Sequence, residues 1–330
     1  MQQPLVSITM STYNVEEYIK ESLNCLVNQT LHEIEVICID DGSTDETLQI
    51  LNYYATTDKR IQVVSKSKNE GLAIARNEAL KLAKGKYITF LDGDDLYDLE
   101  MIQKAYELAE KDNSDLVIWD YVTFWDAYNI EKLKQRTSAL ASISGSNKVA
   151  LLQRPAFTWV KLLKTEKVKE LGIYFPVGLT RQDIPVHWHL ITQLDKISIL
   201  PERLSYYRQQ PEATTAKKDK KLFHLAYVMD IVKQYLSENK IYDKYKNEFL
   251  RQQLNLLFGM YDSVKEEYKK EALSIIKERL TDDHYSFIKQ NNAIRKQAKY
   301  FYLSLRGNPL FKIKYQVWLT LRAIYRKIKS

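Results

Sequence analysis

The chain has 330 residues, of which 45% are hydrophobic and 28% are charged, the composition of an ordinary globular protein. No stretch approaches the roughly 20 consecutive apolar residues of a membrane-spanning helix, and the N-terminus lacks the basic and apolar regions of a signal peptide. Its two cysteines cannot form a disulfide framework, so we expect a protein of the reducing cytoplasm.

Charge is divided unevenly along the chain. Residues 1–216 hold 24 Lys and Arg against 30 Asp and Glu, a balance of −6, whereas residues 217–330 hold 25 against 12, a balance of +13. No acidic residue follows Asp283, so the net charge of +7 is a property of the C-terminal third. Because no recognition motif accompanies these charges, nucleic-acid binding is the weaker explanation of them.

Strands and helices are expected to alternate in the first part of the chain. Short β-branched or apolar runs predict strands, and segments with apolar residues at helical spacing separate them. This alternation predicts parallel βαβ units and a doubly wound α/β sheet. The expected strands are residues 5–10, 35–40, 61–64, 87–91 and 115–119, and the expected helices are residues 15–28, 45–56, 71–84 and 99–111.

The C-terminal third has a different pattern. Between residues 127 and 207 the alternation is weaker, and from residue 216 onwards the chain has helical periodicity and many helix-forming residues. The breaker Gly307-Asn308-Pro309 predicts that a terminal helix begins near Leu310. We therefore expect an α/β domain over residues 1–215 and a basic, all-helical add-on domain over residues 216–330.

Carboxylates cluster directly after the fourth expected strand, in the segment Asp92-Gly93-Asp94-Asp95. Such crowding of like charges costs stability unless a cation lies among them, and a hard divalent cation prefers oxygen ligands. Ligands of open α/β sheets bind beyond the carboxyl ends of the strands, which suits a site here. The alternative is an acidic turn that caps the next helix, with Asp95 or Asp98 as the N-cap.

Two other strand ends also carry polar side chains. After the first expected strand, Ser11, Tyr13 and Asn14 offer a hydroxyl, an aromatic face and an amide that could hold a nucleobase. After the second, Asp41 could accept hydrogen bonds from a nucleobase or a ribose. The alternative in both places is a capped helix start, reached in the second case through a tight turn at Gly42.

A cation follows in the next loop and helix. Arg76 comes shortly after Asn69 and Gly71, where its guanidinium could pair with a phosphate or form a structural salt bridge with Asp92. No P-loop motif is present, and the residues after Asp92 do not match the calcium-binding loop of an EF-hand.

These motifs occur together in an order that resembles the family 2 inverting glycosyltransferases of the GT-A fold. The resemblance covers residues 4–215 and is closest in kind to bacterial accessory glycosyltransferases with a helical C-terminal add-on. The segments that carry it are Pro4–Asn14, Gln29-Thr30, Asp40–Asp45, Asn69-x-Gly71, Ala75–Asn77 and Phe90–Asp95.

The resemblance implies a site for a UDP-sugar. Asp41 would hold the uracil base, and Asp92 and Asp94 would bind Mn²⁺ or Mg²⁺, which would stabilise the departing diphosphate as a Lewis acid. The residues implied in binding the nucleotide are Ser11, Tyr13, Asn14, Asp41, Lys66, Asn69, Arg76, Asp92 and Gly93.

The resemblance also implies a catalytic base. Asp183 occupies its position and would deprotonate the acceptor hydroxyl, but Gln182 stands where relatives usually carry Glu. Gln210 stands where relatives often carry a metal-binding His, so the third metal ligand is open between Gln210, His187, His189 and water. For the two histidines the alternative is ordinary packing.

The implied activity is metal-dependent, inverting transfer of a hexose, with galactose or glucose favoured, from a UDP-sugar to a hydroxyl of a glycan on a protein or lipid carrier. Because Gln182 and Gln210 depart from the family pattern, the alternative is a catalytically weak or inactive nucleotide-sugar-binding scaffold protein in a glycan assembly pathway.

The terminal segment 310–330 is predicted to be a basic amphipathic helix. Such a helix suits peripheral contact with an anionic membrane on its cytoplasmic face. The alternative is that its apolar face packs on the preceding helices. The apolar face consists of Ile313, Val317, Leu321, Ile324 and Ile328, and the opposite face carries Lys312, Arg322, Arg326 and Lys329.

Overall fold

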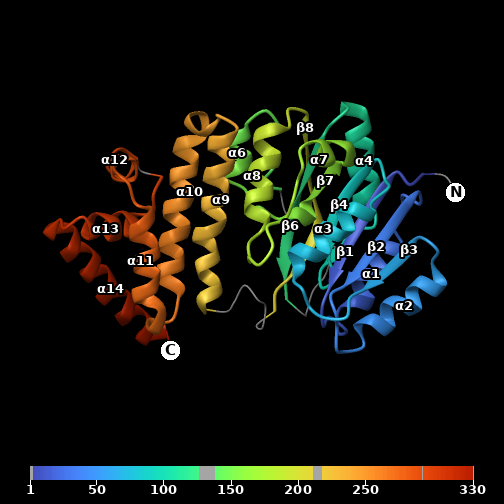
Figure 1. Ribbon diagram of the computed structural model, residues 1–330, viewed down its shortest axis with the longest axis horizontal. Coiled ribbons are helices and arrows are strands. Elements are labelled where there is room, and N and C mark those ends of the chain that lie inside the picture. Colours follow the sequence, from blue (N-terminus) through green and yellow to red (C-terminus); the bar gives the residue numbers. More distant parts are fainter. Residues whose placement is uncertain (1–2, 126–137, 211–217, 292, 330) are drawn as a thin grey trace. The chain divides into compact units, whose positions relative to one another are not determined.

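The computed structural model divides the chain into two compact units, Met1–Thr214 and Thr215–Ser330 (Figure 1). The expected domain boundary at residues 215 and 216 lies outside the described residues, as do the side chains of residues 326–330, which include Ile328, Arg326 and Lys329 of the predicted amphipathic helix. The structure describes residues 3–125, 138–210, 218–291 and 293–329.

The first unit is built on one mixed sheet with the strand order β3-β2-β1-β4-β7-β6-β8-β5. The pairs β3-β2, β2-β1, β1-β4 and β6-β8 are parallel, and β7 is antiparallel to both of its neighbours. The predicted α/β fold with a mostly parallel sheet is confirmed. The strands are β1 (Val6–Thr12), β2 (Ile34–Asp40), β3 (Ile61–Ser65), β4 (Tyr87–Asp92), β5 (Leu96–Tyr97), β6 (Leu116–Phe124), β7 (Lys161–Lys164) and β8 (Ile197–Arg208).

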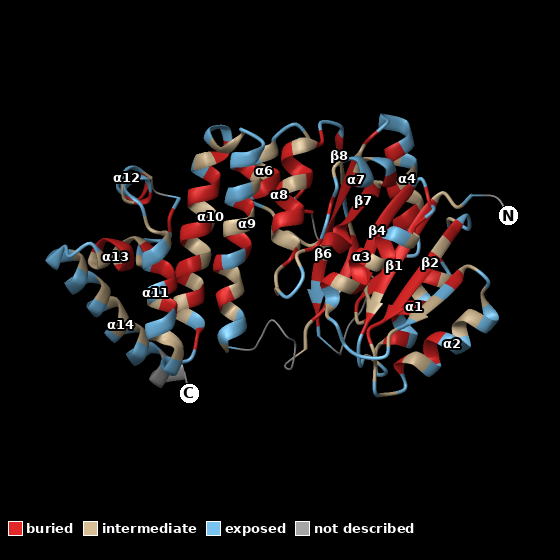
Figure 2. Cartoon of the chain, in the orientation of Figure 1, coloured by how far each residue is buried: buried red, intermediate tan, exposed pale blue. Residues whose placement is uncertain are grey.

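The central strands are buried on both faces because helices cover the sheet. Figure 2 shows β1, β2 and β4 as buried, whereas exposed residues gather on the outer sides of the helices. This explains the nearly continuous apolar runs of these strands, which are typical of parallel sheets. The helices of this unit are α1 (Ile19–Val27), α2 (Thr47–Thr57), α3 (Leu72–Leu82), α4 (Met101–Asp112), α6 (Lys148–Leu152), α7 (Thr165–Glu170) and α8 (Asp183–Gln193), with the 3-10 turn η1 (Thr158–Val160).

The first helix begins later than its periodicity predicts, at Ile19 instead of residue 15. The backbone N–H of Val15 donates to the side-chain oxygen of Thr47 (2.9 Å), and that of Glu16 donates to the carboxylate of Asp45 (3.1 Å). The side chains of Asp45 and Thr47, at the start of α2, thus hold the segment between β1 and α1 at the edge of the sheet.

The register of the parallel strands brings the predicted motifs to one edge. Ser11 of β1 pairs with Asp92 of β4, and Thr12 pairs with Asp40 of β2. The carboxyl ends of β1, β2 and β4 therefore meet, together with the loops that follow them.

The described part of the second unit is helical, as predicted. Helix α10 contacts α9, α11, α12 and α13, and its residues Phe249, Leu254 and Leu257 are fully buried. Among the described residues, no helix has the length and apolar character needed to cross a bilayer. The helices are α9 (His224–Glu238), α10 (Tyr242–Ser263), α11 (Lys269–Arg279), α12 (Asp282–Gln290), α13 (Lys296–Leu305) and α14 (Pro309–Lys329), with the 3-10 turns η3 (Lys220–Phe223) and η4 (Glu266–Tyr268).

Candidate active site

The loop after β1 is tied to the loop after β2 through Asn14. Its backbone N–H donates to the hydroxyl of Ser43 (3.1 Å), and its side-chain oxygen accepts from the backbone N–H of Thr44 (2.8 Å). Asn14 holds a positive φ of 50°, a conformation that asparagine tolerates better than most residues. Ser11 is half-buried at the same edge, and the ring of Tyr13 is 45% exposed, which leaves an aromatic face free to stack.

The carboxylate of Asp41 is buried and holds the loop that leads into α3. It accepts from the backbone N–H groups of Glu70 (3.0 Å) and Gly71 (2.7 Å). A carboxylate has about four acceptor positions, so Asp41 can accept a further donor from a bound base. Asn69 lies exposed in the same loop.

Close packing of two loops requires glycine at position 42. Gly42 has a φ of +74°, and a Cβ there would lie 2.5 Å from the carbonyl carbon of Lys68. Any side chain at this position would push apart the loop of Asp41 and the loop of Asn69.

Lys66 adds a positive charge beside Asp41. Its Nζ lies 3.7 Å from the carboxylate of Asp41, 2.6 Å from that of Glu70 and 3.6 Å from that of Glu78. Burial by itself lowers the pKa of Lys66, but the hydrogen bond to Glu70 and the three negative charges raise it overall. The lysine is therefore a permanent cation in the candidate nucleotide pocket.

Arg76 joins two carboxylates that are far apart in the sequence. Its side chain is buried in α3, with one guanidinium nitrogen 2.9 Å from the carboxylate of Asp92 and the other 2.5 Å from that of Asp183. Its guanidinium also lies 5.4 Å from the centre of the Phe175 ring. The structure shows the ion pair with Asp92 that the sequence offered as one alternative, and it adds the pair with Asp183.

Asp183 is the first residue of α8 and reaches the site from the far end of the unit's sequence. Burial raises its pKa, the charge of Arg76 lowers it, and the nearby Asp92 raises it again, so that the net shift is upward. A carboxylate with a raised pKa is a better proton acceptor near neutral pH.

Lys161, a cation that the sequence reasoning did not single out for the site, acts on Asp183 electrostatically. It is buried and donates to the carbonyl oxygens of Ala156 (3.2 Å) and Phe157. Burial lowers the pKa of Lys161 to about 7. No sequence spacing signals such a role, because the burial that makes this lysine unusual comes from the packing of β7.

The acidic segment after β4 is held in a buried turn. Burial, followed by the charge of Asp92, raises the pKa of Asp94 to about 6. Asp95 is fully buried, and one of its carboxylate oxygens accepts from the backbone N–H of Arg208 (2.8 Å). Gly93 lies against β1 and α1, where a Cβ would be 2.8 Å from the methyl group of Thr12.

The alternative of a simple helix cap accounts for Asp98 alone. The N-cap of α4 is Glu100, and its backbone N–H donates to the carboxylate of Asp98 (3.0 Å). Asp92, Asp94 and Asp95 make no such bond to the start of α4. Helix capping therefore does not explain why these three carboxylates lie so close together.

The end of β8 lies directly on this acidic turn. Gln210 donates from its side-chain amide to the carboxylate of Asp94 (3.1 Å), and the guanidinium of Arg208 donates to the backbone oxygen of Asp94 (3.0 Å). Arg208 itself lies 4.8 Å from the ring of Tyr18 and 4.9 Å from that of Phe124. The sequence reasoning did not identify Arg208, because only the fold brings residue 208 to residue 94.

A metal ion at this turn would be held by the carboxylates of Asp92 and Asp94 and by phosphate oxygens of the bound nucleotide. Within the ranges that the structure describes, no group of three or more His, Cys, Asp or Glu side chains could hold a metal ion. The repulsion between Asp92 and Asp94 that raises the pKa of Asp94 is what a divalent cation would relieve, so these two residues fit an ion completed by phosphate oxygens. Such an ion would act as a Lewis acid on the leaving group.

The two histidines considered as metal ligands belong to no such group. His187 is buried with its Nε2 3.1 Å from the carbonyl oxygen of Leu151, and burial lowers its pKa well below the ordinary value. Burial also lowers the pKa of His189 to about 4. Of the three side chains proposed as a further ligand, Gln210 is the one shown beside Asp94.

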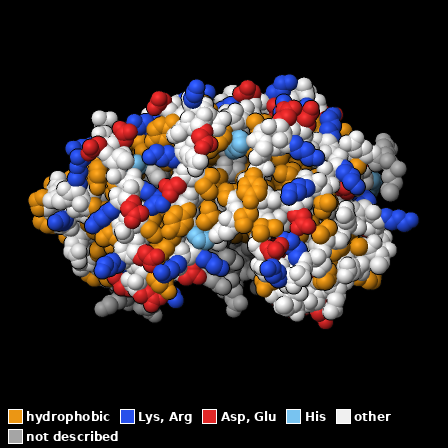
Figure 3. Space-filling view, in the orientation of Figure 1, with side chains coloured by type: hydrophobic (Ala, Val, Ile, Leu, Met, Phe, Trp, Pro, Cys, Tyr) orange, Lys and Arg blue, Asp and Glu red, His pale blue; other side chains and the backbone are white. Residues whose placement is uncertain are grey.

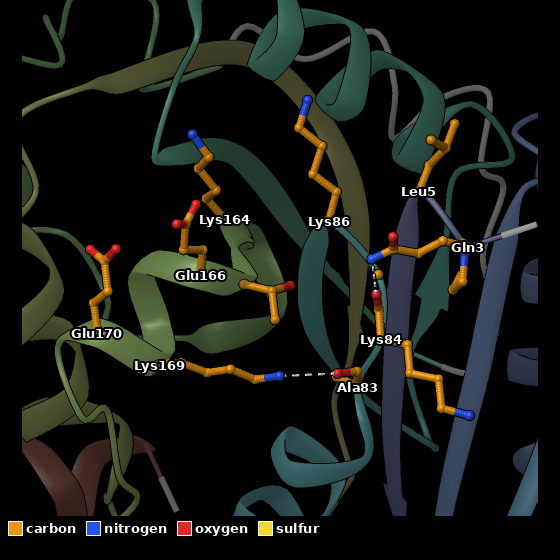
Figure 4. Close-up of a pocket in the computed structure, with 12 residues that line it drawn as sticks. Gln3, Leu5, Ala83, Lys84, Lys86, Lys164, Glu166, Lys169 and Glu170 are labelled. Carbon is orange, nitrogen blue, oxygen red and sulfur yellow. Dashed lines mark hydrogen bonds between the residues drawn. The ribbon is translucent and has the colours of Figure 1, made fainter.

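A cavity of about 820 Å³ lies away from these residues. Figure 4 shows Leu5, Lys86 and Lys164 around it, and these residues flank the amino ends of β1 and β4. The side chain of Lys169 donates to the carbonyl oxygen of Ala83 there (3.3 Å). Because the candidate residues gather at the carboxyl ends of the same strands, this cavity is a separate feature and not the candidate site.

Comparison with known sequences identifies the family. Residues 7–170 match the model of glycosyl transferase family 2. The chain is 31% identical over 228 residues to the uncharacterized glycosyltransferase EpsJ of Bacillus subtilis, a match that covers 64% of this chain and 63% of EpsJ. It is also 31% identical over 227 residues to the poly(ribitol-phosphate) beta-glucosyltransferase of Bacillus spizizenii, which covers 68% of this chain and 34% of that protein.

Solved structures show the same fold. A structure of S. aureus TarS 1–349 in complex with UDP-GlcNAc superposes with a TM-score of 0.66 at 23% identity, covering 89% of this chain and 82% of that one. The mannosyltransferase PcManGT from Pyrobaculum calidifontis, in complex with GDP-Man and Mn²⁺, gives a TM-score of 0.58 at 16% identity, covering 98% and 87%. The fold is thus that of the GT-A class of glycosyltransferases. The chain belongs to family 2 of these enzymes, as its sequence predicted.

Proposed function

We propose that this chain catalyses the metal-dependent, inverting transfer of a hexose from a UDP-sugar to a hydroxyl of a glycan on a protein or lipid carrier. The observation that carries the proposal is the pair of contacts made by Arg76, which joins Asp92 of the acidic turn to Asp183 of α8. Arg76 therefore holds two carboxylates close together. Asp92 is suited to binding the metal and diphosphate, and Asp183 is suited to general base catalysis.

The donor would lie along the carboxyl ends of β1, β2 and β4. Asp41 and the exposed ring of Tyr13 would hold the base, with Ser11, Asn14 and Asn69 beside it and Lys66 near the phosphates. Asp92 and Asp94 would bind Mn²⁺ or Mg²⁺, with Gly93 leaving room for the turn. Support for a nucleotide-sugar donor comes from the complexes of TarS with UDP-GlcNAc and of PcManGT with GDP-Man and Mn²⁺.

The acceptor hydroxyl would approach Asp183. As the hydroxyl oxygen attacks the anomeric carbon from the face opposite the diphosphate, its proton passes to the carboxylate of Asp183 and the bond to the diphosphate breaks. One such displacement inverts the anomeric centre. The β product in the name of the related Bacillus spizizenii glucosyltransferase fits this stereochemistry and supports glucose as a donor sugar.

A cytoplasmic location at the inner face of the membrane suits this function, because nucleotide sugars and lipid-linked acceptors meet there. The basic helix α14 supports peripheral contact with that surface.

The alternative is a nucleotide-sugar-binding scaffold protein without transfer activity. Two departures from the family pattern favour it: Gln182 precedes the proposed base, and Gln210 lies beside Asp94 where relatives often carry His. Such a protein would bind the donor and leave it intact.

The full chain should be tested with UDP-glucose, UDP-galactose and UDP-N-acetylglucosamine, with Mn²⁺ and with EDTA. We expect slow hydrolysis of one donor, measured as released UDP, that stops when EDTA removes the metal. Calorimetric binding of a donor without hydrolysis or transfer would favour the scaffold alternative. Absence of binding by all three donors would contradict both functions.

A further inference from the structure

Helix α14 packs on its unit through an aromatic face. The ring of Tyr315 lies 5.4 Å from that of Phe301, and the ring of Trp318 lies 6.2 Å from that of Phe258. On the same side Arg322 forms an ion pair with Asp262 of α10. These contacts hold α14 against α10 and α13.

The aliphatic face of α14 is exposed. Its residues recur every three or four positions from 310 to 324, so they form one stripe about 21 Å long at 1.5 Å per residue. They are Leu310 (55% exposed), Ile313 (63%), Val317 (53%), Leu321 (60%) and Ile324 (50%).

This arrangement excludes one of the two alternatives that the sequence left for the helix, the packing of its predicted apolar face. The predicted apolar face, which includes Ile313, Val317 and Leu321, does not pack on the preceding helices. Trp318 lies on the packed face. A continuous exposed row of aliphatic side chains is unusual on a monomeric protein and marks an interaction surface.

The charges around this stripe favour an anionic partner. Residues 310–330 contain six Lys and Arg and no acidic residue. Lys312 is exposed, and the ammonium group of Lys314 lies 5.2 Å from the centre of the Phe311 ring. Figure 3 shows apolar and basic side chains side by side at the end of the second unit formed by α13 and α14.

A second copy of the chain fits this surface poorly. Residues 217–330 carry a balance of +13, so two copies meeting through α14 would bring like charges together. A bilayer with anionic headgroups offers an apolar layer for the aliphatic stripe and negative charge for the exposed Lys312 and Lys314.

We propose that the exposed aliphatic face of α14 inserts into the headgroup region of an anionic bilayer, with the exposed Lys312 and Lys314 against the lipid phosphates. This refines the membrane contact in the proposed function by naming the inserting residues, and it requires no glycosyl transfer. The aromatic face, including Trp318, stays packed within the unit.

The test is co-sedimentation of the full chain with vesicles of phosphatidylcholine alone and of phosphatidylcholine mixed with phosphatidylglycerol. We expect binding to the mixed vesicles only, weakened roughly tenfold when Ile313→Ser and Leu321→Ser are combined. The matched control combines Leu99→Ser and Val149→Ser, which remove two exposed aliphatic side chains from the first unit and should leave vesicle binding unchanged.

The charge contribution is tested separately. Lys312→Gln with Lys314→Gln should weaken binding to the mixed vesicles and make the remaining binding less sensitive to added salt, because each basic residue near an anionic surface contributes about 1 kcal/mol and salt screens that contribution. Lys59→Gln with Lys111→Gln, two exposed lysines of the first unit, is the control with the same loss of charge.

Two results would overturn the inference. One is equal binding of the wild type and the Ile313→Ser/Leu321→Ser variant to the mixed vesicles, with both proteins folded by circular dichroism. The other is concentration-dependent dimerisation in sedimentation velocity, abolished by the same variant, without vesicle binding. Vesicle binding is read without a sugar donor, so failure of the glycosyltransferase proposal would be seen separately, in the hydrolysis assay.

Discussion

Arg76 and Asp183, 107 positions apart in the sequence, form an ion pair with 2.5 Å between guanidinium nitrogen and carboxylate oxygen. The side chain of Arg76 is 2% exposed and that of Asp183 is 21% exposed. The same guanidinium binds Asp92, so one buried cation serves two carboxylates with different proposed roles.

Replacing Arg76 should damage both stability and activity. Arg76→Met leaves Asp92 and Asp183 without their cation, and removal of one partner of a buried ion pair typically costs about 3–5 kcal/mol. The pKa of Asp183 should rise further, because the charge of Arg76 lowers it. The acidic limb of the pH–rate profile should therefore move to higher pH, and urea unfolding should show the loss of stability.

Arg76→Lys is the informative companion to this variant. It keeps the positive charge but cannot bind two carboxylates through separate nitrogens of one planar group. We expect an intermediate shift of the acidic limb. An unchanged profile in both variants would show that Arg76 does not control the protonation of the base.

Asp183→Asn should strongly lower the rate of transfer and leave donor binding intact. The amide cannot accept the acceptor's proton, and loss of a general base typically lowers kcat by about 10²–10⁴-fold. The KM for the donor should change little. Asp195→Asn, at an exposed position just after α8, is the matched control. Wild-type kcat in Asp183→Asn would refute the assignment of this residue as the base.

Gly42→Ala should be markedly destabilising. The positive φ of 74° costs an alanine about 1–2 kcal/mol, and the contact at 2.5 Å with the backbone of Lys68 adds overpacking of about 1–3 kcal/mol. Gly172→Ala is the control, because φ there is +59° but no atom lies within 4 Å of the added Cβ. Equal losses of stability on urea unfolding would show that the loops of Asp41 and Asn69 are not packed as described.

His284 should make the second unit less stable in mild acid. Its Nε2 lies 2.8 Å from the side-chain oxygen of Gln253, and burial lowers its pKa to about 4. The unfolded chain binds a proton near the ordinary pKa of about 6.5 while the folded protein does not. Stability should therefore fall as the pH drops from about 6.5 to 4, by up to roughly 3 kcal/mol from this group.

The contribution of His284 is isolated by comparing variants. In His284→Gln the difference in unfolding free energy between pH 7 and pH 5, followed by circular dichroism, should be smaller than in the wild type. His32→Gln, at an exposed position in the first unit, should show the wild-type difference. Identical pH dependence in all three proteins would contradict the prediction.

Gln210→His should tighten Mn²⁺ binding. The side-chain nitrogen of Gln210 lies 3.1 Å from a carboxylate oxygen of Asp94. Because imidazole is a stronger metal ligand than an amide, we expect the affinity for Mn²⁺ to rise roughly tenfold, measured by titration with UDP present. Gln209→His is the neighbouring control, since residue 209 makes its backbone bond to Phe124 instead. Unchanged Mn²⁺ affinity in Gln210→His would place the metal elsewhere.

Local sequence was sufficient for the strands β1, β2, β3 and β4 and for the polar residues at their ends. β1, β2 and β4 are short apolar runs that are buried on both faces, so their pattern depends little on what packs beside them. β3 is the partly exposed edge strand, and its β-branched residues predicted it. Asp92 and Asp94 were recognisable because three carboxylates in four residues carry a cost that any fold must meet.

Tertiary structure alone decided what these residues meet. The antiparallel insertion of β7 between β4 and β6 cannot be read from a run of four residues, and it is what buries Lys161. The pairing of Arg76 with Asp183 depends on where α3 and α8 lie relative to the sheet. In α14 both the aliphatic and the aromatic sides are apolar, so periodicity could locate two faces but could not say which one packs. The choice follows from the neighbouring rings of Phe258 and Phe301, which only the folded unit supplies.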